Sequence, residues 1–487
     1  MSKSQKSNSK AVSAGIGYTI GNYMLKGLSF FTIPLFTRLL STSDYGTLNT
    51  VLAYEGIICI IMSFTIHSSY KNARYKYKYV SEGAKPGEDY YTYISTTLLL
   101  VICSFLGWLV VCNIIAPIIE SKLGIDKFGL NLVLIYSFSS AIITCYNIYL
   151  GIRYEYKQFV KVSGINAVSS ICISVLLILT IFRYDRYIGR LLGITLPSFL
   201  IALYIVIYFF RKAKPGNKNH SLSWGLKYSI PIVPHGLGQV VLNQFDRIMI
   251  TSMVGSSFSG IYSFGYNIYS IVIITAQSLD NVWNPWFYEQ MQAANTLQIK
   301  KKSSIYVRIM TLFTCAIICV SPEIVKILGA REYWDAVYCV VPIMAGGFFT
   351  FLYTLPVAVE YYYEKTTLIA AGTIGAALIN IALNYIFIGK FGYIAAAYTT
   401  LATYIIYFIF HYCIASHIEK ESLFSLKNII ICSAGVLAIA AFSVFQVDTL
   451  WIRWLVGIIC GVSMIVYGEK TVGIIQRVAN KFKGSAK

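Results

Sequence analysis

The sequence predicts an all-α integral membrane protein that crosses the bilayer about fourteen times. Three observations favour this class: 56% of the 487 residues are hydrophobic, only 13% are charged, and the mean hydropathy is +0.63. Soluble domains carry about 25% charged residues, so this chain lacks roughly half of the usual water-facing surface. It is therefore not expected to be a soluble enzyme.

A membrane-crossing helix needs about 20 mostly apolar residues, and windows of this kind follow one another along the chain. In order, they cover 11–37, 45–67, 90–118, 128–150, 162–182, 187–210, 227–254, 257–280, 303–321, 337–360, 366–388, 393–416, 426–445 and 450–468. The first window follows a polar, basic start and has no small-residue cleavage site. We expect it to be a retained span rather than a signal peptide.

The net charge of +19 is arranged as in a membrane protein, not as in a nucleic-acid-binding protein. Most of the 40 Lys and Arg residues fall in every second connection, which fixes those connections, and both termini, in the cytoplasm. The clusters are also suited to touch anionic lipid headgroups. They are Lys71–Lys85, Arg211–Lys227, Lys300–Lys302 and the C-terminal tail.

The predicted connections are short, and none contains a nucleotide-binding Gly-rich loop or a Walker-type Lys-Ser/Thr sequence. An ATP-driven transporter in a single chain is therefore excluded. Outer loops at 120–127 and 322–335 are too small to build a catalytic pocket alone, which disfavours an enzyme. The eleven cysteines are scattered through the spans without a CxxC or Cys/His cluster, so we expect packing residues, no metal and no cofactor.

Internal similarity indicates a duplicated body, as is usual for secondary transporters. A shift of 214 residues aligns Thr37, Ser43, Gly46 and Ile57 with Thr251, Ser257, Gly260 and Ile271. A shift of 206 residues aligns Tyr187–Ile188 with Tyr393–Ile394. We predict two six-helix bundles, 1–212 and 213–420, related by a pseudo-two-fold axis along the membrane normal. Residues 421–487 would add two helices and a basic cytoplasmic tail.

The leading spans of both predicted bundles carry polar faces. In the seventh span, His235, Gln239, Asn243 and Asp246 follow at spacings of four, four and three, which places them on one helix face. Arg247 lies about 100° further round the helix.

The first span repeats this pattern with Tyr18, Asn22, Lys26 and Ser29, and it ends outward at Arg38. Because buried ionisable groups at membrane depth usually face a cavity or a partner, we predict a shared polar cavity between the bundles.

Structural alternatives exist for each group. Asp246 and Arg247 would snorkel or lock helices together, Lys26 and Glu55 would form a buried structural ion pair, and His235 would make an interhelical hydrogen bond. Pro34, Pro231 and Pro234 would be packing kinks as readily as gating hinges.

Aromatic residues are abundant, with 39 tyrosines expected mainly at the membrane interfaces. The segment 280–288, Asp-Asn-Val-Trp-Asn-Pro-Trp-Phe-Tyr, is expected to lie on the surface as a short amphipathic element. The run Tyr361–Tyr363 is expected to anchor at the lipid headgroups, with sugar stacking as the alternative.

Three ordered motifs carry a family resemblance. They are Pro34–…–Thr37–Arg38–Leu39–Leu40–Ser41–…–Asp44–Tyr45–Gly46, Asn243–Gln244–Phe245–Asp246–Arg247 and Trp283–Asn284–Pro285–Trp286. With them, the chain resembles the O-antigen and capsule type of oligosaccharide flippase, within the multidrug/oligosaccharidyl-lipid/polysaccharide exporter superfamily. In that family an Arg or Pro-Glu often precedes the Tyr-Gly pair, whereas Ser43–Asp44 stand here.

The resemblance implies alternating-access transport of an undecaprenyl-diphosphate-linked oligosaccharide to the outer leaflet of the bacterial cytoplasmic (inner) membrane. The implied partners are that lipid, membrane lipids, a polysaccharide polymerase and glycosyltransferases, with no nucleic acid. We hypothesise that Lys26, Arg38 and Arg247 neutralise the diphosphate. Asn22, Gln239 and Asn243 would bind sugar hydroxyls, with His235 in the same cavity. The membrane potential, or a proton or sodium gradient acting at Glu55 or Asp246, would drive transport.

Other functions stay open at this point. A multidrug extruder of the same superfamily would need an acidic or aromatic pocket for its cationic substrates, which the surplus of Lys and Arg disfavours. A lipid II or sporulation-type flippase is not separable by composition. A membrane glycan polymerase or acyltransferase, or a purely structural scaffold, fits the sequence less well.

Overall fold

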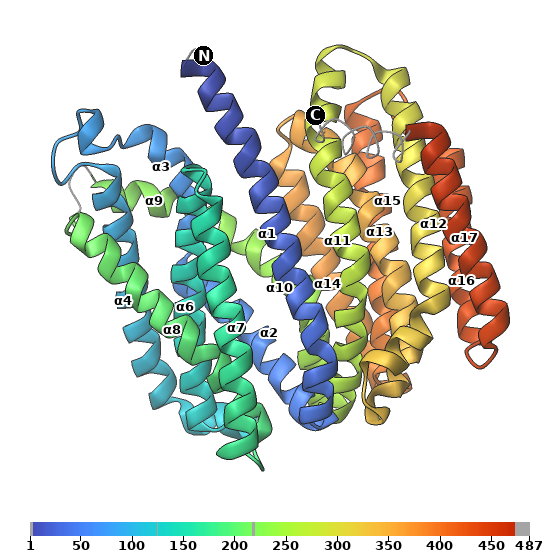
Figure 1. The fold of residues 1–487 in the computed structure, drawn as a ribbon, viewed down its shortest axis with the longest axis horizontal. Helices are drawn as coiled ribbons and strands as arrows, with labels where there is room; N and C mark the ends of the chain where they lie inside the picture. The colour runs from blue at the N-terminus through green and yellow to red at the C-terminus, as the bar shows by residue number, and fades with distance from the viewer. Residues whose placement is uncertain (1–2, 124, 217–219, 473–487) are drawn as a thin grey trace, which may run out of the picture. The chain divides into compact units, whose positions relative to one another are not determined.

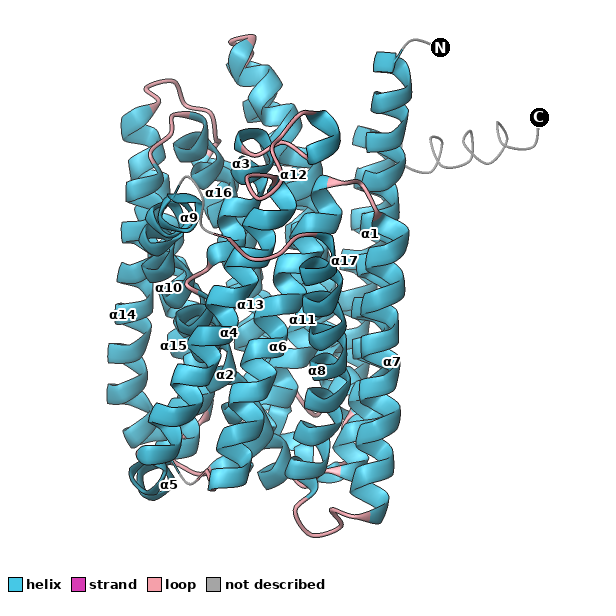
Figure 2. Cartoon of the chain, turned by 90° about the vertical axis from the view of Figure 1, so that its left-hand side faces the viewer, coloured by secondary structure: helices cyan, strands magenta, loops and turns pink. Residues whose placement is uncertain are grey.

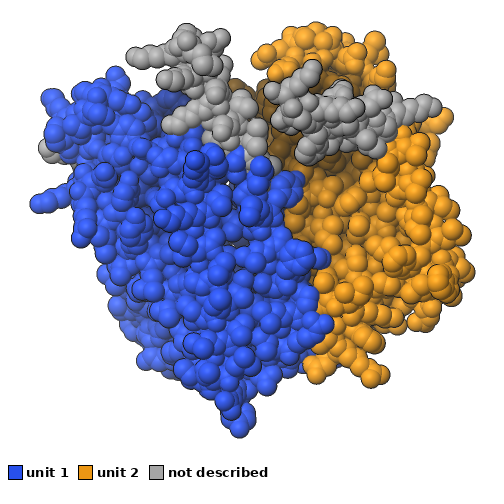
Figure 3. All heavy atoms as spheres, viewed as in Figure 1, with its two compact units in different colours: residues 1–260 blue, residues 261–487 orange. Residues whose placement is uncertain are grey.

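The computed structural model describes residues 3–123, 125–216 and 220–472, and this part of the chain contains helices and no strand (Figure 1, Figure 2). The all-α class is confirmed. Helices dominate because a backbone in lipid must satisfy its own hydrogen bonds. The chain divides into two compact units, residues 1–260 and residues 261–487 (Figure 3).

Unit 1 contains the first part of the chain. Its elements are α1 (Lys3–Leu39), α2 (Thr42–Ser63), η1 (Ile66–Ser69), α3 (Tyr70–Lys76), η2 (Val80–Glu82), α4 (Tyr90–Ile114), α5 (Ala116–Leu123), α6 (Lys127–Ile152), α7 (Tyr156–Thr180), α8 (Arg186–Lys212), α9 (Ser221–Ser229), η4 (Ile230–Ile232), α10 (Val233–Met253) and the first turn of α11 (Ser256–Gln292).

Unit 2 contains the rest of α11. It continues with α12 (Thr296–Leu328), η5 (Arg331–Ala336), α13 (Val337–Tyr362), α14 (Thr366–Phe391), α15 (Ile394–Ile418), α16 (Leu426–Phe445) and α17 (Leu450–Val472). The predicted division into 1–212, 213–420 and 421–487 stays a prediction, because compactness groups α9 and α10 with the helices before them. The basic tail from residue 473 lies outside the described residues.

Eleven helices of the described chain are long and apolar enough to cross a membrane. The helices α1, α10 and α11 are not among them, although the sequence predicts spans there. Two of these three carry the predicted polar faces, which lowers their apolar character. The multi-pass class is therefore supported, while the count of fourteen stays a prediction.

The least buried spans carry the apolar surface that a bilayer would cover. The apolar window of α13 is 83% buried, whereas that of α17 is 11% buried. Trp451 and Phe445 are 84% and 86% exposed. Exposure of large apolar patches of this kind to water is unfavourable, so these helices require a lipid surrounding.

Two segments differ from their predictions. The segment 280–288, predicted to lie on the surface, is part of the continuous helix α11, and Trp283 and Phe287 within it are buried. The ring of Trp283 packs against Tyr306 of α12 at a centroid distance of 5.4 Å. This burial explains why the aromatic run stays in the helix. Likewise, α12 extends beyond Pro322 to Leu328, into the predicted outer loop.

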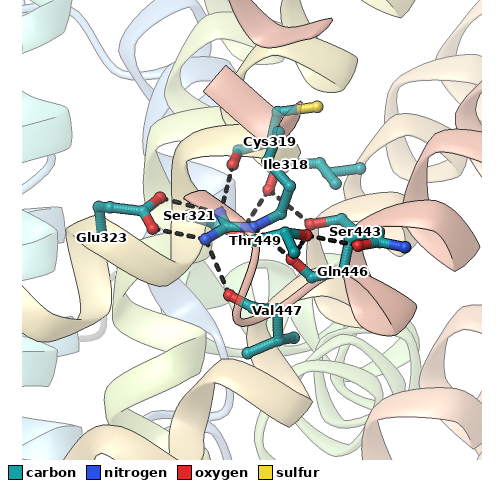
Figure 4. A network of polar contacts seen from close by, with 9 residues as sticks. Ile318, Cys319, Ser321, Glu323, Ser443, Gln446, Val447 and Thr449 are labelled. Carbon is teal, nitrogen blue, oxygen red and sulfur yellow. Dashed lines mark hydrogen bonds and ion pairs between the residues drawn. The ribbon is translucent and has the colours of Figure 1, made fainter. Parts of the chain in front are cut away.

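In unit 2, Arg453 fixes α17 to α12, and its side chain is 1% exposed. Its guanidinium forms a bidentate pair with Glu323, with Nη1–Oε2 at 2.9 Å and Nη2–Oε1 at 2.6 Å. The remaining donors reach the carbonyls of Cys319, Gln446 and Val447 (Figure 4). A buried charge is tolerated when it is paired and its donors are satisfied.

A proline near this pair also receives compensation. Pro322 lies inside α12 and has no N–H to donate to the carbonyl of Ile318, one turn earlier. The hydroxyl of Ser443 on α16 donates to that carbonyl at 3.3 Å (Figure 4). The two C-terminal helices are thus joined to α12 by polar contacts as well as by apolar packing.

Replacing Glu323 by Gln should destabilise the protein by about 3–5 kcal/mol, because it leaves the Arg453 charge buried without its partner. The measurement is the thermal unfolding midpoint of the purified protein in detergent. The matched control is Glu332→Gln, since Glu332 is an exposed residue of the neighbouring η5. Equal midpoints for the two variants would contradict the structural role of the pair.

Candidate functional site

The entry to α10 is broken by two prolines. The short helix α9 ends at Ser229, a 3-10 turn carries Pro231, and α10 begins at Val233 with Pro234 in its first turn. Proline fits the first turn of a helix because the missing N–H would have no helical partner there. The prolines therefore separate two helices, rather than bending one continuous span.

The predicted polar face of α10 hydrogen-bonds back onto its own backbone. The Asn243 side-chain amide donates to the carbonyl of Gln239 at 2.7 Å, and Arg247 Nη1 donates to the carbonyl of Asn243 at 2.9 Å. His235, Gln239 and Asn243 are half-buried, whereas Asp246 and Arg247 are buried. Burial excludes snorkelling for the last two. The Nδ1 atom of His235 has no hydrogen-bond partner among the described residues.

Helix α10 packs against α2 through small polar residues. The hydroxyls of Thr50 and Thr251 lie 2.6 Å apart, and Ser259 donates to the carbonyl of Arg247 at 3.2 Å. Gly56 of α2 faces Val240, whose side chain would lie 3.2 Å from a Cβ at that position. These contacts fix the rotation of α10, and with it the direction of its polar face.

The starts of α2 and α11 meet backbone to backbone. A Cβ on Gly46 would lie 1.8 Å from the carbonyl oxygen of Ser256, and a Cβ on Gly260 would lie 1.9 Å from that of Thr42. Only glycine permits this approach. Both glycines stand four residues after the first residue of their helix, and the 214-residue shift aligns both members of each pair. The contact is therefore reciprocal between matching segments of the predicted repeat.

The polar face of α1 has a different packing partner. Helix α1 packs against α7, where the ring of Tyr18 lies 5.0 Å from that of Phe159. Asn22 and Lys26 are exposed, and the side chain of Ser29 lies outside the described residues. Arg38 is exposed and donates to the carbonyl of Pro34 at 3.3 Å. The predicted cavity shared with α10 stays a prediction, because the two helices pack on different neighbours.

Glu55 is half-buried on α2, and its carboxyl is hydrogen-bonded to Ser140 of α6. Lys26 is exposed on α1, and the alternative of a buried structural ion pair between Lys26 and Glu55 stays a prediction. Glu55 faces α6 within unit 1. Among the described residues, no three His, Cys, Asp or Glu side chains are placed to hold a metal ion.

The basic cluster between α2 and α4 is held in place by aromatic rings. Arg74 pairs with Glu82 at 2.6 Å and lies 4.2 Å from the ring centre of Tyr79, while Lys76 lies 4.5 Å from that of Trp224. The hydrogen bond from Arg74 holds the pKa of the Glu82 carboxyl below its usual range. Cations over aromatic faces suit a headgroup-level surface.

Unit 2 contains a cavity of about 980 Å³ between α12, α16 and α17. Arg308 and Lys427 belong to its lining, together with apolar residues such as Val462 and Val466. Arg308 donates to the side-chain oxygen of Asn428 at 2.7 Å. Such a lining is able to hold an apolar chain that ends in an anionic group.

Comparison with known proteins identifies the family. The family described as Polysaccharide biosynthesis protein matches residues 12–291, more than half of the chain. The chain belongs to this family. A Haemophilus influenzae protein named for the Lsg locus is 23% identical over 385 residues, which are 75% of this chain and 88% of that relative. The polysaccharide biosynthesis match contains both polar faces and both contacting glycines.

Solved structures share the fold of this polysaccharide biosynthesis protein. The lipid II flippase MurJ, in an inward closed conformation, gives a TM-score of 0.70 at 16% identity and covers 94% of this chain and 99% of its own. An inward-facing MATE multidrug resistance transporter of the MOP superfamily gives 0.60 at 14% identity, with 82% and 96% covered. The resemblance stated from the sequence is thus confirmed for family and fold.

The sequence patterns did not single out one further cation. Arg190 of α8 lies 3.8 Å from the ring centre of Phe36 in α1 and donates to the hydroxyl of Ser174 in α7 at 2.8 Å. It therefore ties together the helix that carries Lys26 and two of its neighbours. The available signal was an arginine inside an apolar span, one turn after Arg186.

Replacing Gly46 or Gly260 by Ala should destabilise the protein by roughly 1–3 kcal/mol. The new methyl group would clash with a backbone carbonyl of the facing helix, which is fixed by its own helical hydrogen bonds. Thermal unfolding of the purified variants measures the loss. The control is Gly107→Ala in α4, where a Cβ would meet nothing within 4 Å. The control should be neutral or slightly stabilising, since Ala favours helix over Gly. A Gly46→Ala protein as stable as the control would contradict the close contact.

Proposed function

We propose that this protein flips an undecaprenyl-diphosphate-linked oligosaccharide from the cytoplasmic to the outer leaflet by alternating access. It would do so in the bacterial cytoplasmic (inner) membrane, with both termini in the cytoplasm. The observation that carries the proposal is Lys26, an exposed cation in the middle of a long helix of a polysaccharide biosynthesis family member. A charge at bilayer depth costs on the order of 3 kcal/mol unless it has a polar surrounding.

In this proposal the isoprenoid tail stays in lipid while the headgroup crosses through a polar space. Lys26, Arg38 and Arg247 neutralise the diphosphate, and Asn22, Gln239 and Asn243 bind sugar hydroxyls beside His235. Arginine suits phosphate because its forked donors match two oxygens, and lysine acts as a point charge. Arg247 is buried and bonded to the carbonyl of Asn243, so it would exchange that acceptor for phosphate during transport.

The partners follow from the substrate. Glycosyltransferases would build the oligosaccharide on the cytoplasmic side, and a polysaccharide polymerase would receive it on the outer side. No cofactor is required, because the membrane potential or an ion gradient supplies the energy. Glu55 or Asp246 would exchange the coupling proton or sodium ion.

A second candidate is a multidrug extruder, which the likeness to MATE transporters favours. Small cations require acidic groups that they can reach. Asp246, however, is completely buried in this structure, and the exposed charges on α1 are cationic. These observations favour the anionic lipid-linked substrate. A glycan polymerase would instead join sugar units of lipid-linked glycans, and isotope transfer by purified protein supplied with lipid-linked sugar would detect that reaction.

Replacing Lys26 or Arg247 by Ala should slow flipping by about 10- to 100-fold, as expected when a hydrogen bond to a charged group worth about 1.5–3 kcal/mol is lost. The measurement uses vesicles that contain purified protein and a fluorescent lipid-diphosphate oligosaccharide whose outer-leaflet fraction is quenched. Lys26→Arg should recover most of the rate. Lys365→Ala is the control, an exposed lysine of the α13–α14 turn. Wild-type rates in correctly inserted Lys26→Ala and Arg247→Ala proteins would contradict the assignment.

An inside-negative potential should accelerate outward flipping, because a doubly negative headgroup gains about 4–5 kcal/mol per 100 mV when it moves outward. Protein cations that move with the headgroup would reduce this gain. The same vesicles, with imposed potential, pH and sodium gradients applied one at a time, separate the driving forces. If the flipping rate is the same with and without each of the three gradients, only the substrate gradient is left to drive transport.

A further inference from the structure

Unit 2 contains a pair of titratable side chains that transport through α1 and α10 does not use. Glu360 lies near the C-terminal end of α13, and His411 lies on α15. Both side chains are completely buried, and His411 Nδ1 lies 2.6 Å from Glu360 Oε1. A carboxyl and an imidazole in an apolar span are expensive to bury, so each needs a partner.

The pair leaves one polar atom of each residue open. Glu360 Oε2 and His411 Nε2 are buried and have no hydrogen-bond partner among the described residues. Gly372 of α14 faces the imidazole, and a Cβ at that position would lie 2.7 Å from Nε2. A larger residue on α14 would displace the ring, so glycine makes room for it.

Aromatic rings enclose the pair on the other sides. Tyr407 and Phe410 of α15 lie 4.6 and 5.2 Å from the imidazole centre, and Tyr353 of α13 lies at 6.1 Å. The hydroxyl of Tyr407 is bonded to that of Thr373 on α14.

The other titratable groups that act on this region are Tyr361 of α13 and Asp280 of α11. Gly372 and Thr373, which α14 contributes, do not titrate. Among the described residues, no ion pair brings a Lys or Arg to the dyad.

A comparison within unit 2 shows what a purely structural pair looks like. Arg453 uses its donors on Glu323 and on three backbone carbonyls. Glu360 and His411 are buried more completely, and yet each keeps one polar atom without a hydrogen-bond partner among the described residues. A purely structural pair gains nothing from unpaired polar atoms, because burying a polar atom without a hydrogen-bond partner is unfavourable.

The charge of the dyad changes with one proton. Without it, a neutral imidazole beside an ionised carboxylate leaves a net charge of −1 in an apolar interior. With it, the pair is neutral overall, whether the proton is on the imidazole or on the carboxyl. Loss of the proton therefore favours separation of α13 and α15, or entry of water between them.

We propose that Glu360 and His411 form a buried binding site for one exchangeable proton, whose release shifts α13 against α15 during transport. The proton site stands by itself, whereas its coupling to flipping rests on the proposed function. This site differs from Glu55 and Asp246, which lie in unit 1. A lone Glu and a lone His inside apolar spans are the sequence signals for it.

The first test measures the proton directly. Infrared difference spectroscopy of the protein in nanodiscs, between acid and alkaline buffer, should show a carboxyl band that Glu360→Gln removes. Potentiometric titration should show one proton fewer for that variant over the same pH range. Glu332→Gln, which removes an exposed carboxyl of η5, is the control and should leave the band of Glu360 in place. If the Glu360→Gln protein retains the band and the full proton count, the site is wrong.

The second test measures coupling in vesicles with an imposed pH gradient. One proton per cycle changes the equilibrium distribution of the fluorescent lipid by up to about tenfold per pH unit. Glu360→Gln and His411→Asn should flatten this dependence, and Glu332→Gln, at an exposed residue of η5, should retain it. Gly372→Ala, which displaces the imidazole without removing it, gives an independent variant if His411→Asn is unstable. An unchanged pH dependence in all dyad variants would overturn the coupling.

The outcomes separate the two proposals. If the protein takes up a proton at Glu360 but flips no lipid-linked oligosaccharide, the proton site is supported and the proposed function is wrong. If the protein flips the lipid without taking up a proton at Glu360 and His411, the proposed function is supported and the proton site is wrong.

Discussion

The close approach of α2 and α11 at Gly46 and Gly260 is the contact on which the rest of unit 1 depends. Two backbones touch there without side chains between them, and Ser43 and Ser256 add a hydroxyl pair at 2.7 Å. Because α10 leads directly into α11 and packs along α2, this crossing fixes where α10 lies. The polar face of α10 is therefore oriented by glycines that carry no functional group. A methyl group at either position would act on the site from a distance.

Small and hydroxylated residues play this role because lipid supplies no hydrophobic driving force between helices. Close packing and short hydrogen bonds must hold such helices together. Thr50, Thr251 and Ser259 join α2, α10 and α11 in this way. The long side chains of Asn243 and Arg247 bond to the backbone of α10, and in the proposed transport Arg247 exchanges that acceptor for phosphate. Along α10, small residues thus hold the helix in place, while long polar residues carry the proposed binding function.

The sequence predicts these features unevenly, for physical reasons. Apolar windows and the 214-residue shift are local patterns, so the all-helical class and the matching segments at Gly46 and Gly260 were within reach. The segment 280–288 was misplaced because an amphipathic pattern does not reveal that Trp283 packs on Tyr306. Lys26 and Glu55 stay unassigned to one another because depth in the membrane does not fix the direction of a side chain. Arg190, Glu360 and His411 depend on partners far along the chain, which composition and spacing do not disclose.

The charged groups of this protein fall into two kinds, and the difference lies in their unused bonding capacity. Arg453 and Glu323 satisfy one another and the adjacent carbonyls, so any movement breaks bonds without making new ones. Glu360 and His411 are buried more completely but retain open atoms, so a proton or water entering their site finds a bond to make. Stability requires the first kind, since a satisfied pair resists change. A carrier that alternates between two states requires the second kind of charged group. An unused hydrogen-bond donor or acceptor can form a new bond when a proton or water binds, and the free energies of the two states then change relative to one another.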